Sequence, residues 1–213
     1  MKTDDMISLL AANVAPVDRG ALARRYRWAL LLGGLGSTLL MSVKFGIRPD
    51  IREMLVTPLF WAKIALPVSV AAAALLTAAR LSRPGMPVGR GWRLLAAPIA
   101  LVWIVAAVML ALAPAPERLP MVLGATWRTC PFNITLLSVP SFIAVFWAMK
   151  GLAPTRLRQA GAVAGLLASA VATVAYCLHC PEMGVAFWAV WYVAGMAIPA
   201  LLGALLGPRL LRW

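Results

Sequence analysis

The chain has 213 residues, of which 62% are hydrophobic, and its 20 Lys and Arg against 7 Asp and Glu give a net charge of +13. So apolar a composition in so short a chain indicates a membrane protein with one domain and leaves no room for a soluble enzyme domain. A nucleic-acid-binding protein is disfavoured as well, because the basic residues are distributed between long apolar runs instead of forming one patch.

The N-terminal tail, residues 1–27, is predicted to begin with a short amphipathic helix. Thr3 is a suitable N-cap, and Asp4 and Asp5 fall in the first turn, where the helix dipole favours negative charge. The residues that share its apolar face are Met6, Ile7, Leu9 and Leu10. A helix this short is only marginally stable alone in water, and its apolar face is therefore expected to be buried against either the bilayer or a protein. The acidic residues favour a basic groove on a protein partner over an anionic membrane surface.

Residues 28–208 are predicted to form an all-α domain, a bundle of six transmembrane helices, followed by a short C-terminal tail at 209–213. Each uncharged run, with its flanks, can supply roughly 17–25 residues of spanning helix. The six runs are 28–43, 64–79, 94–116, 129–149, 159–181 and 183–208. Lys63, just before the second run, is expected to extend its ammonium group to the nearby membrane interface.

The basic residues are divided unequally between the two sides of this predicted bundle. With the N-terminus in the cytoplasm, 14 of the 20 Lys and Arg fall on the cytoplasmic side and 6 on the other. The six are Lys44, Arg48, Arg52, Lys63, Arg118 and Arg128. Since cytoplasmic loops of membrane proteins carry the excess of positive charge, both termini are predicted to be cytoplasmic. The basic charge then belongs to topology and anionic lipid headgroups.

Ionisable side chains are scarce inside the predicted spans. The six runs contain no Asp, Glu, Lys or Arg, and the one His, His179, lies at the outer end of the fifth run. Transporters and pumps usually carry such residues along their ion or proton pathways. A small transporter is therefore a disfavoured alternative.

The three cysteines are the candidate chemical site. Cys130 precedes the fourth span and Cys180 follows the fifth, each directly before a proline, so both are predicted at the outer face of neighbouring helices. This places them within reach of a disulfide or of a shared soft metal ion. Cys177, His179 and Glu182 are candidate additional ligands. From the residues alone, a sensing role and a structural role for the cysteines remain open, and Cys177 is as readily a packing residue.

Several segments, taken in order, resemble the NrsF family of bacterial six-span anti-sigma factors. The matching segments are residues 2–11, 16–19, 57–63, 152–155, 178–182, 190–192 and 205–213. The resemblance covers essentially the whole chain. It implies a protein of the inner membrane, not an enzyme, whose cytoplasmic tail holds an extracytoplasmic-function sigma factor through Asp4, Asp5, Met6, Leu9 and Leu10.

The resemblance also implies a role for two of the cysteines. Cys130 and Cys180 match a pair of outer-face cysteines linked to stress sensing, whereas Cys177 has no counterpart in that pattern. Oxidation of the pair, or its binding of a transient heavy-metal ion, is expected to release the sigma factor, and no resident cofactor is expected. The competing hypothesis of a quinone-linked thiol oxidoreductase is disfavoured because such an enzyme normally needs two cysteine pairs.

Overall fold

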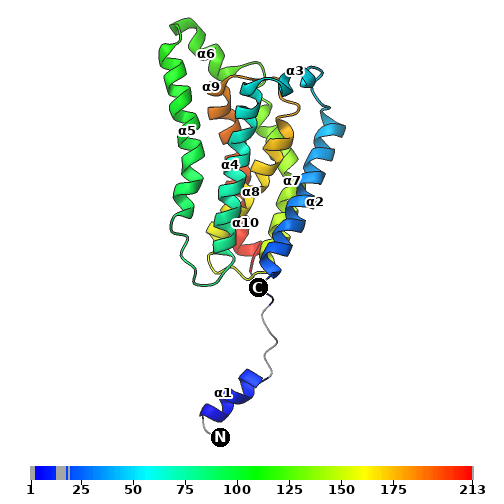
Figure 1. The fold of residues 1–213 in the computed structure, drawn as a ribbon, viewed down its shortest axis with the longest axis vertical. Coiled ribbons are helices and arrows are strands. Elements are labelled where there is room, and N and C mark those ends of the chain that lie inside the picture. The colour runs from blue at the N-terminus through cyan, green and yellow to red at the C-terminus, as the bar shows by residue number, and fades with distance from the viewer. Residues whose placement is uncertain (1–2, 13–17, 19, 213) are drawn as a thin grey trace.

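The computed structural model describes residues 3–12, 18 and 20–212, and every regular element in this part of the chain is helical. The predicted all-α class is therefore confirmed. The first helix, α1 (Thr3–Ala12), lies apart from the other helices, which form a bundle (Figure 1). All ten residues of α1 are exposed.

The bundle consists of long helices that run alternately in opposite directions (Figure 1). They are α2 (Ala21–Lys44), α4 (Pro58–Leu81), α5 (Gly91–Leu112), α7 (Cys130–Lys150), α8 (Leu157–Tyr176) and a composite last helix. This last helix joins α9 (Val185–Phe187), the π-helical turn η1 (Trp188–Tyr192) and α10 (Val193–Leu210).

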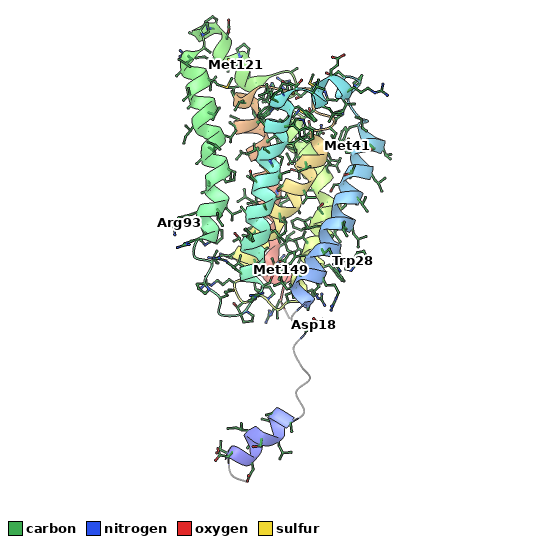
Figure 2. The ribbon with its side chains drawn as sticks, in the orientation of Figure 1. Asp18, Trp28, Met41, Arg93, Met121 and Met149 are labelled. Carbon is green, nitrogen blue, oxygen red and sulfur yellow. The ribbon has the colours of Figure 1, made fainter. Side chains whose placement is uncertain are left out.

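The two ends of the bundle differ in composition. We call one the cysteine end; it comprises residues 45–57, 113–130 and 177–184 and includes the short helices α3 (Ile51–Leu55) and α6 (Ala115–Leu123). The other, the arginine end, comprises residues 82–90 and 151–156, the start of α2 and the end of α10. Met41 and Met121 lie toward the first end, and Arg93 and Met149 toward the second (Figure 2).

Within the described residues, five helical segments are long and apolar enough to cross a membrane: α4, α5, α7, α8 and Val185–Leu210. The helix α2 has the same length as α4, 24 residues, but its first turns carry Arg24, Arg25 and Arg27. Two predicted boundaries are wrong. The run 94–116 is divided, because α5 ends at Leu112 and the separate helix α6 follows Pro114. The run 159–181 is helical only to Tyr176, so Cys177 is already the C-cap of α8, and Cys180 follows the helix as predicted.

The central helix is α8, which packs against α2, α4, α7 and α10. Its contact with α10 is close because glycines face each other across it: a Cβ on Gly161 would lie 2.1 Å from the Gly203 carbonyl oxygen, and one on Gly165 would lie 2.0 Å from that of Pro199. We call this contact, with Gly207, the glycine seam. It is the close helix packing that paired small residues permit.

The helix α2 is joined to α7 in a similar way. A Cβ on Gly33 would lie 2.7 Å from Cα of Ser141, so only glycine lets the two helices approach this closely. The hydroxyl groups of Ser37 and Ser141 then meet at 2.9 Å, and both side chains are buried. The helix α2 is thereby packed on α7, the helix that begins with Cys130.

The helix α5 stands at the edge of the bundle (Figure 1). Only 17% of its apolar segment is buried, against 72% for α8. It packs on α4, α9 and η1, and the indole Nε1 of Trp103 donates a 2.8 Å hydrogen bond to the Ala189 carbonyl oxygen in η1. A π-helical turn disturbs the regular hydrogen-bond ladder, and here a side chain of the neighbouring helix bonds to one of its carbonyls.

Candidate functional site at the cysteine end

The three cysteines lie together in one buried cluster, although Cys130 is fifty residues from Cys180 in the chain. Cys130 is the first residue of α7, while Cys177 and Cys180 follow α8. All three are free thiols with no exposed surface, and they belong to one apolar cluster with Tyr176 and Tyr192. We call these five residues, with Lys63, the cysteine cluster.

The side chains of Cys130 and Cys180 lie beside each other in this cluster, close enough to interact. Cys130 is held at this position because its backbone N–H donates to the Thr126 carbonyl oxygen at 3.0 Å, and Pro131 occupies the first turn of α7, where its missing N–H is not needed. The backbone N–H of Cys180 donates to the Tyr176 carbonyl oxygen at 3.0 Å. The structure thus brings together the pair that the sequence pattern selected.

Lys63 does not extend to the interface, and that prediction was wrong. Its side chain is fully buried, and its Nζ donates a 2.6 Å hydrogen bond to the Cys180 carbonyl oxygen. The ammonium also stands 5.8 Å from the centre of the Tyr192 ring. The reason is its helical position: Lys63 shares the face of α4 with buried Phe60 and Val70, and this face packs on α8. The three- and four-residue spacing of that face was the signal that could have revealed it.

Arg48 is a second cation at this site that the sequence pattern did not single out. Its Nη1 donates to the Cys180 carbonyl oxygen at 3.2 Å and contacts the Met183 sulfur at 3.8 Å. Its Nε and Nη2 donate to the two carboxylate oxygens of Asp50, both at 2.6 Å. This hydrogen-bonded ion pair lowers the pKa of the Asp50 carboxyl and raises that of the Arg48 guanidinium.

The candidate ligands His179 and Glu182 have other partners. The Nδ1 of His179 lies 3.0 Å from the Gly46 carbonyl oxygen, and its ring stands between those of Phe45 and Tyr176, with centres 5.2 and 5.8 Å away. In the described part of the chain, no group of three or more His, Cys, Asp and Glu side chains is arranged to hold a metal ion. A two-cysteine metal contact stays a prediction.

Glu182 joins the two segments that carry Cys130 and Cys180. Its Oε1 accepts hydrogen bonds from the Ala125 N–H, the Thr126 N–H and the Thr126 hydroxyl at 2.8, 3.0 and 3.1 Å. The preceding Gly124 has a φ of +54°, and a Cβ there would lie 2.6 Å from the Glu182 carboxylate. Only glycine fits both the backbone conformation and the contact.

The hydroxyl of Tyr192 lies beside Cys177 and Cys180. It is buried, and among the described residues it has no hydrogen-bond partner of ordinary geometry. Its ring is positioned by η1, whose first residue, Trp188, donates from its indole nitrogen to the Glu182 carbonyl oxygen at 3.2 Å. The π-helical turn therefore places an aromatic hydroxyl against the thiols.

The predicted partner-binding residues of the tail all lie on α1. Met6, Leu9 and Leu10 are 47%, 58% and 68% exposed, so their apolar face is not buried against the bundle. Asp4 and Asp5 are in the first turn, as expected. This exposed face and the cysteine cluster lie toward opposite ends of the molecule (Figure 1).

Comparison with known proteins identifies the family. The family model described as negative regulator of sigma F, NrsF, matches residues 10–213. The chain belongs to the NrsF family. It is 46% identical to the probable anti-sigma-F factor NrsF of Azospira oryzae and 35% identical to the anti-sigma-F factor NrsF of Caulobacter vibrioides, in each case over the full length of both chains. No solved structure matches the chain.

Family membership settles the class of protein. NrsF proteins are regulators and not enzymes, which confirms the family resemblance and the predicted absence of catalysis. A thiol oxidoreductase is therefore no longer an alternative for the cysteine cluster.

Proposed function

We propose that this chain is a membrane-bound anti-sigma factor whose tail holds a sigma factor of the extracytoplasmic-function class and whose Cys130 and Cys180 sense a thiol-reactive stress. The observation that carries the proposal is that these two thiols, fifty residues apart in the chain, are buried side by side in an NrsF-family bundle. The names of both relatives indicate that they act on a sigma factor.

The proposed location is the bacterial inner membrane, crossed six times. Five segments have the required length and apolarity, and α2 supplies the sixth span if its arginines lie at the lipid headgroups. In the proposed topology the arginine end, with the start of α2 and the end of α10, lies on the cytoplasmic side, and the excess of basic residues on that side supports this orientation. The cysteine end then lies at the outer face.

The proposed sigma-factor contact is the exposed face of α1. An isolated helix of ten residues gains stability mainly when its apolar face is buried, and Met6, Leu9 and Leu10 are available for this. Asp4 and Asp5 at its start suit a basic groove. The tail would cover a surface that the sigma factor needs for binding to RNA polymerase.

The contact on α1 is tested by Leu9→Asp, which places a charge on the apolar face. Ser8→Asp is the matched control, because Ser8 lies on the opposite face of the same helix. We expect Leu9→Asp to abolish co-purification of the sigma factor with the intact membrane protein and Ser8→Asp to preserve it. Equal retention by both variants would place the sigma-factor contact elsewhere.

The proposed trigger is a change in how Cys130 and Cys180 are joined. Moving a two-state equilibrium from 1:99 to 99:1 requires about 5.5 kcal/mol of difference between the states. A disulfide closing a loop of this length contributes roughly 4 kcal/mol, and a thiolate metal site on the order of 10 kcal/mol. Either change is large enough to contribute most of the required shift.

The sensor pair is tested with serine, which keeps the side-chain size but forms neither a disulfide nor a soft metal–sulfur bond. Cys130→Ser and Cys180→Ser should each blunt sigma-dependent transcription after exposure to an oxidant or a thiophilic metal. The double variant should be no worse than either single variant, because both residues act in one site. Cys177→Ser is the matched control and should respond nearly as the unmodified protein does. Normal responses from all three single variants would refute the sensor.

A further inference from the structure

The buried ammonium group of Lys63 has no carboxylate partner. Within the described residues, the ion pairs are Arg24–Asp18 and Arg48–Asp50, and neither includes Lys63. Burying an ammonium in an apolar cluster is unfavourable unless it is paired and fully hydrogen-bonded, and an apolar side chain of similar size is usually at least as stabilising. Stability of the bundle therefore does not explain a lysine at this position.

The group that Lys63 does contact is the backbone carbonyl of Cys180. This carbonyl accepts from Lys63 Nζ at 2.6 Å and from Arg48 Nη1 at 3.2 Å, so two charged donors share its two lone pairs. Residues 180–184 belong to no helix, and no helical ladder fixes the carbonyl at this point. Its direction is instead fixed by side chains from α4 and from the segment 45–50.

The direction of the Cys180 backbone matters because the cluster contains a third thiol. Cys177 is held by α8, since its N–H donates to the Thr173 carbonyl oxygen at 2.9 Å. Cys180 stands three residues later, after a turn, where its side chain lies beside that of Cys130, and the Tyr192 hydroxyl lies beside both Cys180 and Cys177. Disulfide formation requires specific Cα and Cβ positions, so a small rotation of the Cys180 backbone changes which thiol it can join.

We propose that Lys63 is a positioning residue of the sensor: by holding the Cys180 carbonyl, it directs the Cys180 sulfur toward Cys130 and away from Cys177. The inference rests on the proposed function, because it concerns the pair assigned there as the sensor. In the oxidation that follows, the two thiols lose two electrons and two protons to an oxidant such as diamide, which becomes the hydrazine as the S–S bond forms.

The experiment oxidises the full-length protein in membranes with diamide, digests it without reduction and quantifies the three disulfides by mass spectrometry. Four proteins are compared: the unmodified chain, Lys63→Met, Lys63→Arg and the control Lys44→Met. Lys44 is an exposed lysine at the same end of the bundle, so its substitution removes an equal charge without touching the cluster. Thermal unfolding of each protein in detergent is measured in parallel.

We expect Cys130–Cys180 to predominate in the unmodified chain and in Lys44→Met. In Lys63→Met, the ratio of this disulfide to those containing Cys177 should fall about tenfold, the factor by which loss of one charge-assisted hydrogen bond changes an equilibrium. Lys63→Arg, which can still donate to the carbonyl, should restore most of the ratio. The unfolding temperature of Lys63→Met should not fall, whereas a merely structural lysine would lower it and leave the ratio unchanged.

An unchanged ratio in Lys63→Met would overturn the proposal, as would a predominance of Cys177 disulfides in the unmodified chain. Should Lys63→Met fail to accumulate in membranes, Lys63→Gln is measured instead, since its shorter, uncharged side chain predicts the same loss. Failure of the proposed sensor function would be a different result. The unmodified protein would then form the Cys130–Cys180 disulfide but keep its sigma factor bound.

Discussion

The glycine seam and the cysteine cluster both involve α8, but they hold the chain in different ways. At the seam, Gly161 and Gly203 bring two backbones into contact, and no side chain lies between them. At the cluster, the chain has left α8, and its position depends on side-chain hydrogen bonds that Lys63 and Arg48 donate and that Glu182 accepts. The glycine seam allows only one arrangement of α8 and α10, because any separation of the two helices removes their contact.

The difference suggests how one end of the bundle can change while the other stays assembled. Each hydrogen bond at the cluster is worth about 1–3 kcal/mol, so a chemical change of a few kcal/mol can rearrange several of them. The glycine seam has no comparable set of separate hydrogen bonds that could break one at a time. We therefore expect the glycine seam to be the fixed part of the molecule and the cysteine end to be the adjustable part.

The largest effect is expected from Gly161→Ala, which places a methyl group in the glycine seam. The new Cβ would lie 2.1 Å from the Gly203 carbonyl oxygen, so α8 and α10 must separate. Overpacking of this kind typically costs about 1–3 kcal/mol, and more where backbone atoms must move. Thermal unfolding in detergent measures this loss of stability. Gly34→Ala is the matched control, because its Cβ would meet only Val171 at an ordinary 3.7 Å. Equal stability of the two variants would mean that the seam is not rigid.

A smaller effect is expected from Glu182→Ala, which removes the link between the segments of Cys130 and Cys180. Three donors on Ala125 and Thr126 lose a charged acceptor, at a cost of about 2–3 kcal/mol reduced by water that replaces it. Unlike the glycine substitution, it should leave the arginine end intact and raise the rate at which Cys130 is alkylated. The control is Glu117→Ala, at an exposed position of α6. Unaltered alkylation of Cys130 would contradict an adjustable cysteine end.

The smallest effect is expected from Trp103→Phe, which acts where α5 packs on η1 at the edge of the bundle. The substitution removes the donor to the Ala189 carbonyl oxygen and should cost about 1 kcal/mol. Hydrogen exchange should rise in η1 and α5 but not in α8 or the glycine seam. Trp28→Phe, at an exposed position of α2, should change neither. Faster exchange along the seam would show that the two regions are not independent.

Much of the fold could be predicted because apolar length and charge distribution report directly on spanning helices. The glycines at 161 and 165 and at 203 and 207 have the small-residue spacing that favours close helix contact, and they do face each other. The end of α8 could not be predicted, since the apolar residues continue to Pro181 while the chain already turns after Tyr176. Hydrophobicity alone does not distinguish a buried turn from another turn of helix.

The candidate site was predicted in part. The meeting of Cys130 with Cys180 followed from adjacent antiparallel helices, a property of topology. Lys63 was misjudged because a lysine near a helix end is usually solvated, and its acceptor is a backbone carbonyl, which carries no signature in the sequence. Glu182 was taken as a candidate ligand since a carboxylate serves metal ions and backbone N–H groups equally well.

The hydrogen bond from Lys63 to Cys180 joins residues 117 positions apart, and this separation bears on how the protein is made. At roughly 5–20 residues per second, the ribosome needs about 6–23 seconds to add that many residues. In the proposed membrane setting, α4 enters the bilayer while its lysine still lacks an acceptor, at a cost of up to about 2.5–3.5 kcal/mol. Until Cys180 has been made, the side chain of Lys63 must extend to the membrane interface, as it would on an isolated helix in the bilayer. A chain that ends before Cys180 therefore keeps this charge without its acceptor.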